Sequence, residues 1–132
     1  MANVLTTQLL IDEERNVVVN IQGFLDTSDL AATTVLNPAT LSARIPAATQ
    51  LNIRKIEFAV EDLLVVSILF DATADVVAFQ CVGRGEVNFC DVGGLNNNAG
   101  AGKTGQIQIS TQGWSVGGLL SFNIVLYCNK QS

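Results

Sequence analysis

The chain has 132 residues, of which 48% are hydrophobic and 14% charged, with a net charge of −5 and no histidine. This composition excludes a disordered chain, and we expect a single domain over residues 1–132 with its own hydrophobic core. The few Lys and Arg residues are scattered and cannot form a phosphate-binding face, so we expect no nucleic-acid partner. Histidine, the side chain that enzyme and metal sites use most often, is missing, so we expect no enzyme activity, no cofactor and no metal.

The first third of the chain predicts strands separated by polar turns. Residues 4–11 carry apolar side chains in both registers of a strand, and residues 17–22 alternate between apolar and polar. A segment rich in Thr and Val ends at Asn37 and Pro38. Residues 38–50 could hold a short helix, although Pro46 would limit its length.

The middle of the chain predicts three more strands. In residues 51–60 the apolar phase shifts, which a bulge near Arg54 and Lys55 would explain. Residues 63–70 are apolar at nearly every position, and residues 76–82 are similar, so both are expected to be covered on two faces. A tight turn then leads into a strand over residues 86–90.

The last third predicts a long loop and two strands. The loop covers residues 93–105, and a Gly-rich turn separates strands at 106–112 and 120–128. About eight strands at roughly ten-residue spacing predict an all-β, single-domain antiparallel β-sandwich of jelly-roll-like architecture. No apolar run is long enough for a transmembrane helix, so no membrane partner is expected.

Two motifs resemble ligand sites. The segment 100–104 reads Gly-Ala-Gly-Lys-Thr, like the end of a phosphate-binding loop, but Asn97 stands where the full motif has glycine and a strand pattern follows. Acidic residues at 26–29 and 71–75 could supply oxygen ligands to Ca²⁺, yet neither segment matches an EF-hand loop. Surface turns explain all three segments better.

The cysteines Cys81, Cys90 and Cys128 are odd in number and lack the CxxC spacing. We expect reduced, buried thiols that pack as small hydrophobic groups. A bridge between Cys81 and Cys90 remains an alternative if their segments form neighbouring strands.

The surplus of apolar residues predicts contact with other subunits, because several strands lack a polar face. We expect a homo-oligomer, either a dimer or a trimer. Trp114 lies in a Gly-rich turn, where its ring could cover the end of the sandwich or anchor a protein contact. The candidate contact residues lie at the start of the first strand, in the Asn-rich loop and in this turn: Asn3, Val4, Leu5, Asn96, Asn97, Asn98 and Trp114.

Segments 1–12 with 15–19, the loop at 93–102 and the closing 118–130 resemble small virion structural proteins of tailed bacteriophages. The resemblance spans most of the chain and contains no catalytic motif. It implies a capsid decoration or cement protein on the virion surface, made in the host cytoplasm, which bridges and stabilises subunits of the major capsid protein.

Two alternatives stay open. The chain could be a structural component of the tail, neck or fibre base. From a different class, it could be a small glycan- or ligand-binding module that uses the turn at Trp114 and the loop at 93–105.

Overall fold

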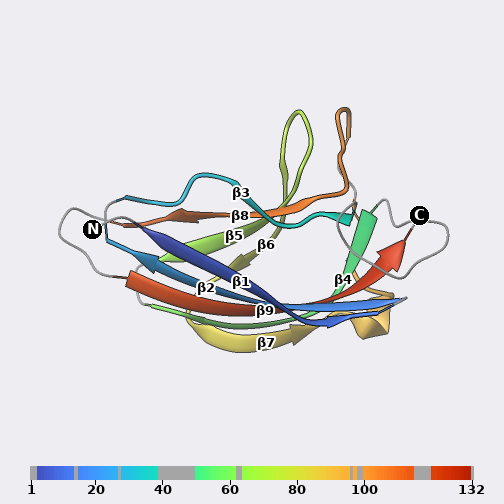
Figure 1. Cartoon of the computed structure of the whole chain (residues 1–132), viewed down its shortest axis with the longest axis horizontal. Coiled ribbons are helices and arrows are strands. Elements are labelled where there is room, and N and C mark those ends of the chain that lie inside the picture. Colours follow the sequence, from blue (N-terminus) through green and yellow to red (C-terminus); the bar gives the residue numbers. More distant parts are fainter. Residues whose placement is uncertain are drawn as a thin grey trace.

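The computed structural model describes residues 3–13, 15–26, 28–38, 50–61, 64–95, 97, 100–114 and 120–131. Within them the chain forms nine strands and a short 3₁₀ turn, η2 (Figure 1). In chain order these are β1 (Val4–Asp12), β2 (Asn16–Leu25), β3 (Thr33–Leu36), β4 (Gln50–Val60), β5 (Val65–Phe70), β6 (Val76–Cys81), β7 (Arg84–Asn88), η2 (Cys90–Val92), β8 (Ile107–Gln112) and β9 (Leu120–Gln131).

The strands form two antiparallel sheets that lie face to face (Figure 1). One has the strand order β1-β2-β9-β4-β7 and the other β3-β8-β5-β6. Because β2 pairs with β9, β3 with β8, β4 with β7 and β5 with β6, the chain resembles one long hairpin rolled into two layers. These nested strand pairs give the strand order of a jelly roll, and β1 is an additional strand at the edge of one sheet. The predicted all-β, jelly-roll-like sandwich is confirmed, with nine strands instead of about eight.

The hydrophobic core lies between the inward faces of the two sheets. On β2, Val17, Val19 and Ile21 are fully buried, whereas Gln22 is exposed. The same alternation on other strands buries a set of large aliphatic side chains: Ile53, Ile56, Ile68, Ile107, Ile109, Ile124 and Leu126. Each of them contributes about 1.5–3 kcal/mol relative to an exposed position. The period-two pattern of the sequence therefore positions both sheets.

The two segments predicted to be covered on both faces differ in the structure. β5 lies between β8 and β6, and its residues 66–70 are buried. β6 is the last strand of its sheet, where Val77 is 50% exposed, and Val82 just beyond it is 59% exposed. The prediction of two covered faces is confirmed for β5 and wrong for 76–82, because an edge strand has a neighbour on one side alone.

Smaller features of the middle segments also depart from simple alternation. The pairing of β4 with β9 shifts between Ile53 and Lys55, which confirms the predicted bulge. The strand expected at 86–90 begins earlier, at Arg84, and ends before Cys90. There the Cys90 backbone N–H donates to Asn88 Oδ1 and the chain enters η2. The helix considered for 38–50 concerns mainly residues 39–49, which lie outside the described part of the chain.

All three cysteines are free, so the alternative bridge between Cys81 and Cys90 does not form. Cys81 and Cys128 are buried, and desolvation raises the pKa of each thiol from 9.0 to about 12. The predicted burial is wrong for Cys90, which is exposed because it belongs to the surface turn η2.

Close packing between β2 and β9 depends on Gly23. This residue lies opposite Phe122, and a Cβ atom at Gly23 would lie 2.2 Å from Phe122 Cζ. The ring therefore occupies the space that a side chain on β2 would need. Phe122 remains buried in this position, at 4% exposure.

We predict that Gly23→Ala lowers the free energy of unfolding by about 1–3 kcal/mol, because the Phe122 ring must move in a packed core. Urea denaturation of both proteins measures the difference. Gly100→Ala is the matched control, since a Cβ atom there meets nothing within 4 Å, and it should change stability by less than about 0.5 kcal/mol. Equal effects of the two substitutions would contradict the packing argument.

Burial of the two thiols predicts a loss of stability at alkaline pH. The pKa of each thiol is higher in the folded state than in the unfolded state, so folding favours the neutral thiol. This contribution to stability is fully present below pH 9.0 and is lost as the pH rises toward about 12. We expect each thiol to account for a loss of about 1 kcal/mol by pH 10. Chemical denaturation from pH 8 to 10 measures the slope, which should be shallower in Cys81→Ala than in wild type. An unchanged slope would refute the assignment.

Candidate functional site

β1 forms one edge of the five-stranded sheet and pairs with β2 alone. Its apolar side chains remain at the surface: Val4 is 52% exposed, Leu9 48%, Leu10 50% and Ile11 45%. Leu5 is the one residue of β1 that packs against the core. An apolar strip along an open strand edge is the most distinctive surface in the described part of the chain.

The other three edge strands are short, and each has a feature that discourages pairing with another chain. β3 has four residues, and its pairing with β8 shifts between Thr34 and Leu36. β6 has six residues, and the register of its pairing with β5 shifts between Ile68 and Leu69. β7 has five residues, among them the exposed charges of Arg84 and Glu86.

β1 differs from these edges in length, charge and regularity. It has nine residues, and none between Val4 and Ile11 is charged. Its one register shift comes after Leu9, so residues 4–9 pair regularly with β2. A long, uncharged and regular edge is the kind of strand that accepts another strand.

Both ends of β1 are held in place. At one end, Asn3 Oδ1 accepts a hydrogen bond from the Asp26 backbone N–H at 3.0 Å, and Asn3 Nδ2 donates to the Ser28 carbonyl. At the other end, Asp12 Oδ1 lies 2.6 Å from Lys130 Nζ, whose side chain is fully buried. The ion pair joins β1 to β9 across β2. The open edge is therefore an anchored strand and not a loose terminal segment.

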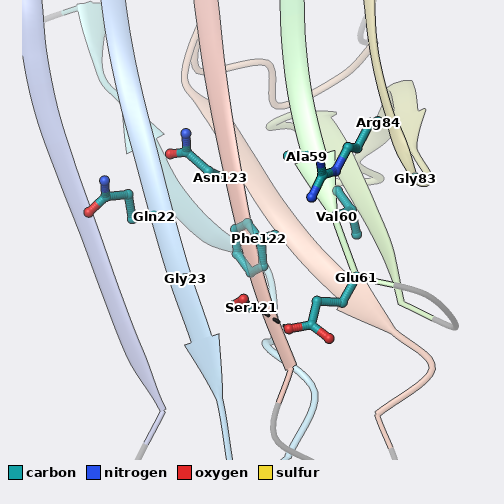
Figure 2. A pocket seen from close by; sticks show the side chains of 10 residues that line it. All are labelled: Gln22, Gly23, Ala59, Val60, Glu61, Gly83, Arg84, Ser121, Phe122 and Asn123. Atoms are coloured by element: carbon teal, nitrogen blue, oxygen red, sulfur yellow. Dashed lines mark hydrogen bonds between the residues drawn. The ribbon is translucent and has the colours of Figure 1, made fainter.

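The outer face of the five-stranded sheet carries a shallow depression of about 740 Å³, lined by polar and apolar groups in similar measure. Figure 2 shows Arg84 extending from β7 over β4, and Glu61 accepting a hydrogen bond from the Ser121 hydroxyl at 3.1 Å. The lining residues come from β2, β4, β7 and β9 and the segments next to them: Gln22, Gly23, Ala59, Val60, Glu61, Gly83, Arg84, Ser121, Phe122 and Asn123.

This depression offers amides, one carboxylate and one guanidinium to the solvent. Phe122, its only aromatic residue, is buried, so the depression has no exposed ring on which a sugar could stack. Farther along the same face, Tyr127 donates to Glu57, and this hydrogen bond is the largest cause of the raised pKa of Tyr127. Lys55 lies 5.0 Å above the Tyr127 ring. These groups neutralise one another and form a solvated polar face.

The predicted contact residues at the start of β1 have three different environments. Val4 is exposed, Leu5 packs against the core, and Asn3 makes the hydrogen bonds described above. The exposed residues Leu9, Leu10 and Ile11 were not among the candidates. The sequence feature that could have indicated them is the presence of apolar side chains in both registers of the strand, because one buried face covers only one of the two registers.

The other predicted contact residues lie away from β1 in sequence. Trp114 packs against the core, and its backbone N–H donates to Asp29 Oδ1 at 3.0 Å. This position fits the interpretation of Trp114 as a cover for the sandwich. Asn97 is 7% exposed, whereas Asn96 and Asn98 lie outside the described residues.

The segment that resembles a phosphate-binding loop forms a paired loop instead. The Thr104 hydroxyl donates to Asp71 Oδ2 at 2.7 Å, and the Thr73 N–H donates to the Ala101 carbonyl. Two neighbouring loops project from the sandwich in this region (Figure 1). β8 follows, where a phosphate site would need a helix. Among the described residues, no group of acidic or cysteine side chains could hold a metal ion.

We predict that Asp12→Asn lowers the free energy of unfolding by about 3 kcal/mol, because the buried Lys130 ammonium loses its carboxylate. The matched control is Glu86→Gln, which removes the more exposed pair between Lys55 and Glu86 and should cost less than about 1 kcal/mol. Urea denaturation measures both effects. A loss of similar size in the two variants would show that the buried pair does not anchor β1.

Comparisons with family models, curated protein sequences and solved structures found no match for this chain. In the part of the chain that the structure describes, no helix is long and apolar enough to cross a bilayer. The interpretation of the surface therefore depends on its own geometry, in which the open edge of β1 is the principal candidate for contact with another molecule.

Proposed function

We propose that this chain is a structural protein of a virus particle, of the capsid decoration or cement type, which stabilises the shell by binding subunits of the major capsid protein. The observation that carries the proposal is β1, a long uncharged edge strand with four exposed apolar side chains: Val4, Leu9, Leu10 and Ile11. A protein with this role needs contact surface and no reactive centre.

The contact follows from the chemistry of a strand edge. Alternate residues of an edge strand direct their backbone N–H and C=O groups away from the sheet, where a strand of another protein can pair with them. Exposed apolar side chains on both sides of β1 would lose water when such a strand binds. Because both ends of β1 are anchored, the strand is already ordered and binding needs little further ordering.

A component of the tail, neck or fibre base would use the same contact chemistry, so copy number separates the two structural roles. A shell protein is present in many copies around the capsid, whereas a neck component is present in few. Quantitative mass spectrometry of purified particles, with antibody labelling in the electron microscope, measures both number and position.

The alternative class, a glycan- or ligand-binding module, is expected from the sequence to use the turn at Trp114 and the loop at 93–105. The feature of the structure that supports this class is a different one, the depression on the outer face of the five-stranded sheet. Its lining includes the guanidinium of Arg84, an exposed residue of β7. Binding on a glycan array that disappears in Arg84→Ala would favour this alternative over the structural role.

We predict that Leu10→Lys weakens binding to expanded capsids at least tenfold, because a charge must be desolvated at the contact, and tenfold corresponds to about 1.4 kcal/mol. Val77→Lys is the matched control, since Val77 is also 50% exposed on an edge strand but lies on β6. Co-sedimentation with capsids at several protein concentrations measures the affinity. The proposal fails if wild-type protein does not bind capsids, or if both variants bind equally well.

A further inference from the structure

The sequence of β1 has a symmetry that concerns pairing with itself. Around Thr7, polar residues stand on both sides, and two apolar residues follow in each direction, in the order Val4, Leu5, Thr6, Thr7, Gln8, Leu9 and Leu10. Read forwards or backwards, the pattern of apolar and polar residues is the same. Two copies of such a strand, placed antiparallel about Thr7, match apolar with apolar and polar with polar.

The faces of the strand match in the same register. Pairing with β2 places Leu5, Thr7 and Leu9 opposite Gly23, Ile21 and Val19. These three side chains therefore lie on the core side of the sheet. With the axis at Thr7, Leu5 of each copy lies opposite Leu9 of the other, on the same side of the joined sheet, and Thr7 lies opposite itself.

Neighbouring registers are less favourable. With the axis at Thr6, Val4 lies opposite Gln8 and Leu5 opposite Thr7. With the axis at Gln8, Leu9 lies opposite Thr7 and Leu10 opposite Thr6. An axis between two residues would bring inner side chains against outer ones, which the pleat of a sheet forbids. The axis at Thr7 is the only one of these that matches both faces and polarity.

Electrostatics also permit contact between identical edges. The molecule has a net charge of −5, which opposes most self-association. Residues 4–11 contain no charge, and the carboxylate of Asp12 is paired with Lys130. β7, the other edge of the same sheet, has five residues and so offers a shorter contact to a second copy.

From these observations we propose that β1 binds β1 of a second copy, antiparallel, with a two-fold axis at Thr7, so that two five-stranded sheets become one continuous sheet. This inference concerns the same strand edge as the proposed function and rests on that function only for its biological role. The two contacts use the same backbone groups of β1, so the dimer must separate before β1 pairs with a strand of the capsid protein. A two-fold axis makes the contact closed, so the pairing yields dimers and not filaments. With one strand from each copy, the interface is small, and the dimer should dissociate on dilution.

Cysteine cross-linking tests the register. In a background of Cys90→Ser, which removes the exposed thiol, Thr7→Cys should form a disulfide-linked dimer under mild oxidation. The Cα atoms of directly opposed residues in antiparallel strands lie about 4.5–5.5 Å apart, within the roughly 4.4–6.8 Å that disulfides span. Thr6→Cys is the matched control, because Thr6 is also exposed but lies opposite Gln8. Stronger cross-linking at position 6 than at position 7, or none at either, would overturn the proposal.

A charge exchange tests the symmetry without oxidation. Thr7→Lys and Thr7→Glu should each shift the protein toward monomer in sedimentation equilibrium, because like charges meet at the axis, and an equimolar mixture should restore the dimer. Circular dichroism and thermal unfolding confirm that both variants are folded. A wild-type protein that stays monomeric at the highest soluble concentration would overturn the pairing, as would a mixture that remains monomeric.

The same variants separate this inference from the proposed function. A monomeric wild-type protein that binds capsids through β1 would refute self-pairing and leave the structural role intact. A dimer with its axis at Thr7 that fails to bind capsids would support the pairing and refute that role.

Discussion

The position of β1 at an open edge of the five-stranded sheet is the constraint on which the surface of this protein depends. The buried core residues of the wider sheet come from its three central strands, β2, β9 and β4, whereas Leu5 is the one residue of β1 that packs against this core. Apolar side chains that would be core residues in a central strand therefore remain in contact with water. The hydrogen bonds of Asn3 and the buried pair of Asp12 and Lys130 keep this strand in the sheet although little packs against it.

The same period-two alternation produces the core and the polar outer face. Val19 and Ile21 point inward from β2, and Gln22 next to them joins the outer depression. On that face, Lys55 is paired with Glu86 at 3.5 Å and lies over the Tyr127 ring. Mutual neutralisation of this kind makes a solvated surface, and the apolar edge stands out against it.

Local patterns predicted those parts of the fold that depend on neighbours in sequence. The alternation of β2, the bulge in β4 and the covered faces of β5 all follow from which side chains need burial. Exposure of Val77 could not be predicted in this way, because its segment is as apolar as a buried strand, and Cys90 is exposed because the strand ends at Asn88 and the chain enters η2. Of the candidate contact residues, Val4 is exposed on β1, whereas Leu9, Leu10 and Ile11 gained their importance from the position of the strand in the sheet.

The sequence by itself determined the all-β class, the side chains that face the core and the uncharged, symmetric pattern of β1. Only the tertiary structure decided that β1 is an edge, that β5 is central, and that the phosphate-loop-like segment pairs with the loop at Asp71. The physical reason is that alternation is a local property of a strand. Its position at the centre or edge of a sheet depends instead on pairings between residues far apart in the chain, such as β2 with β9.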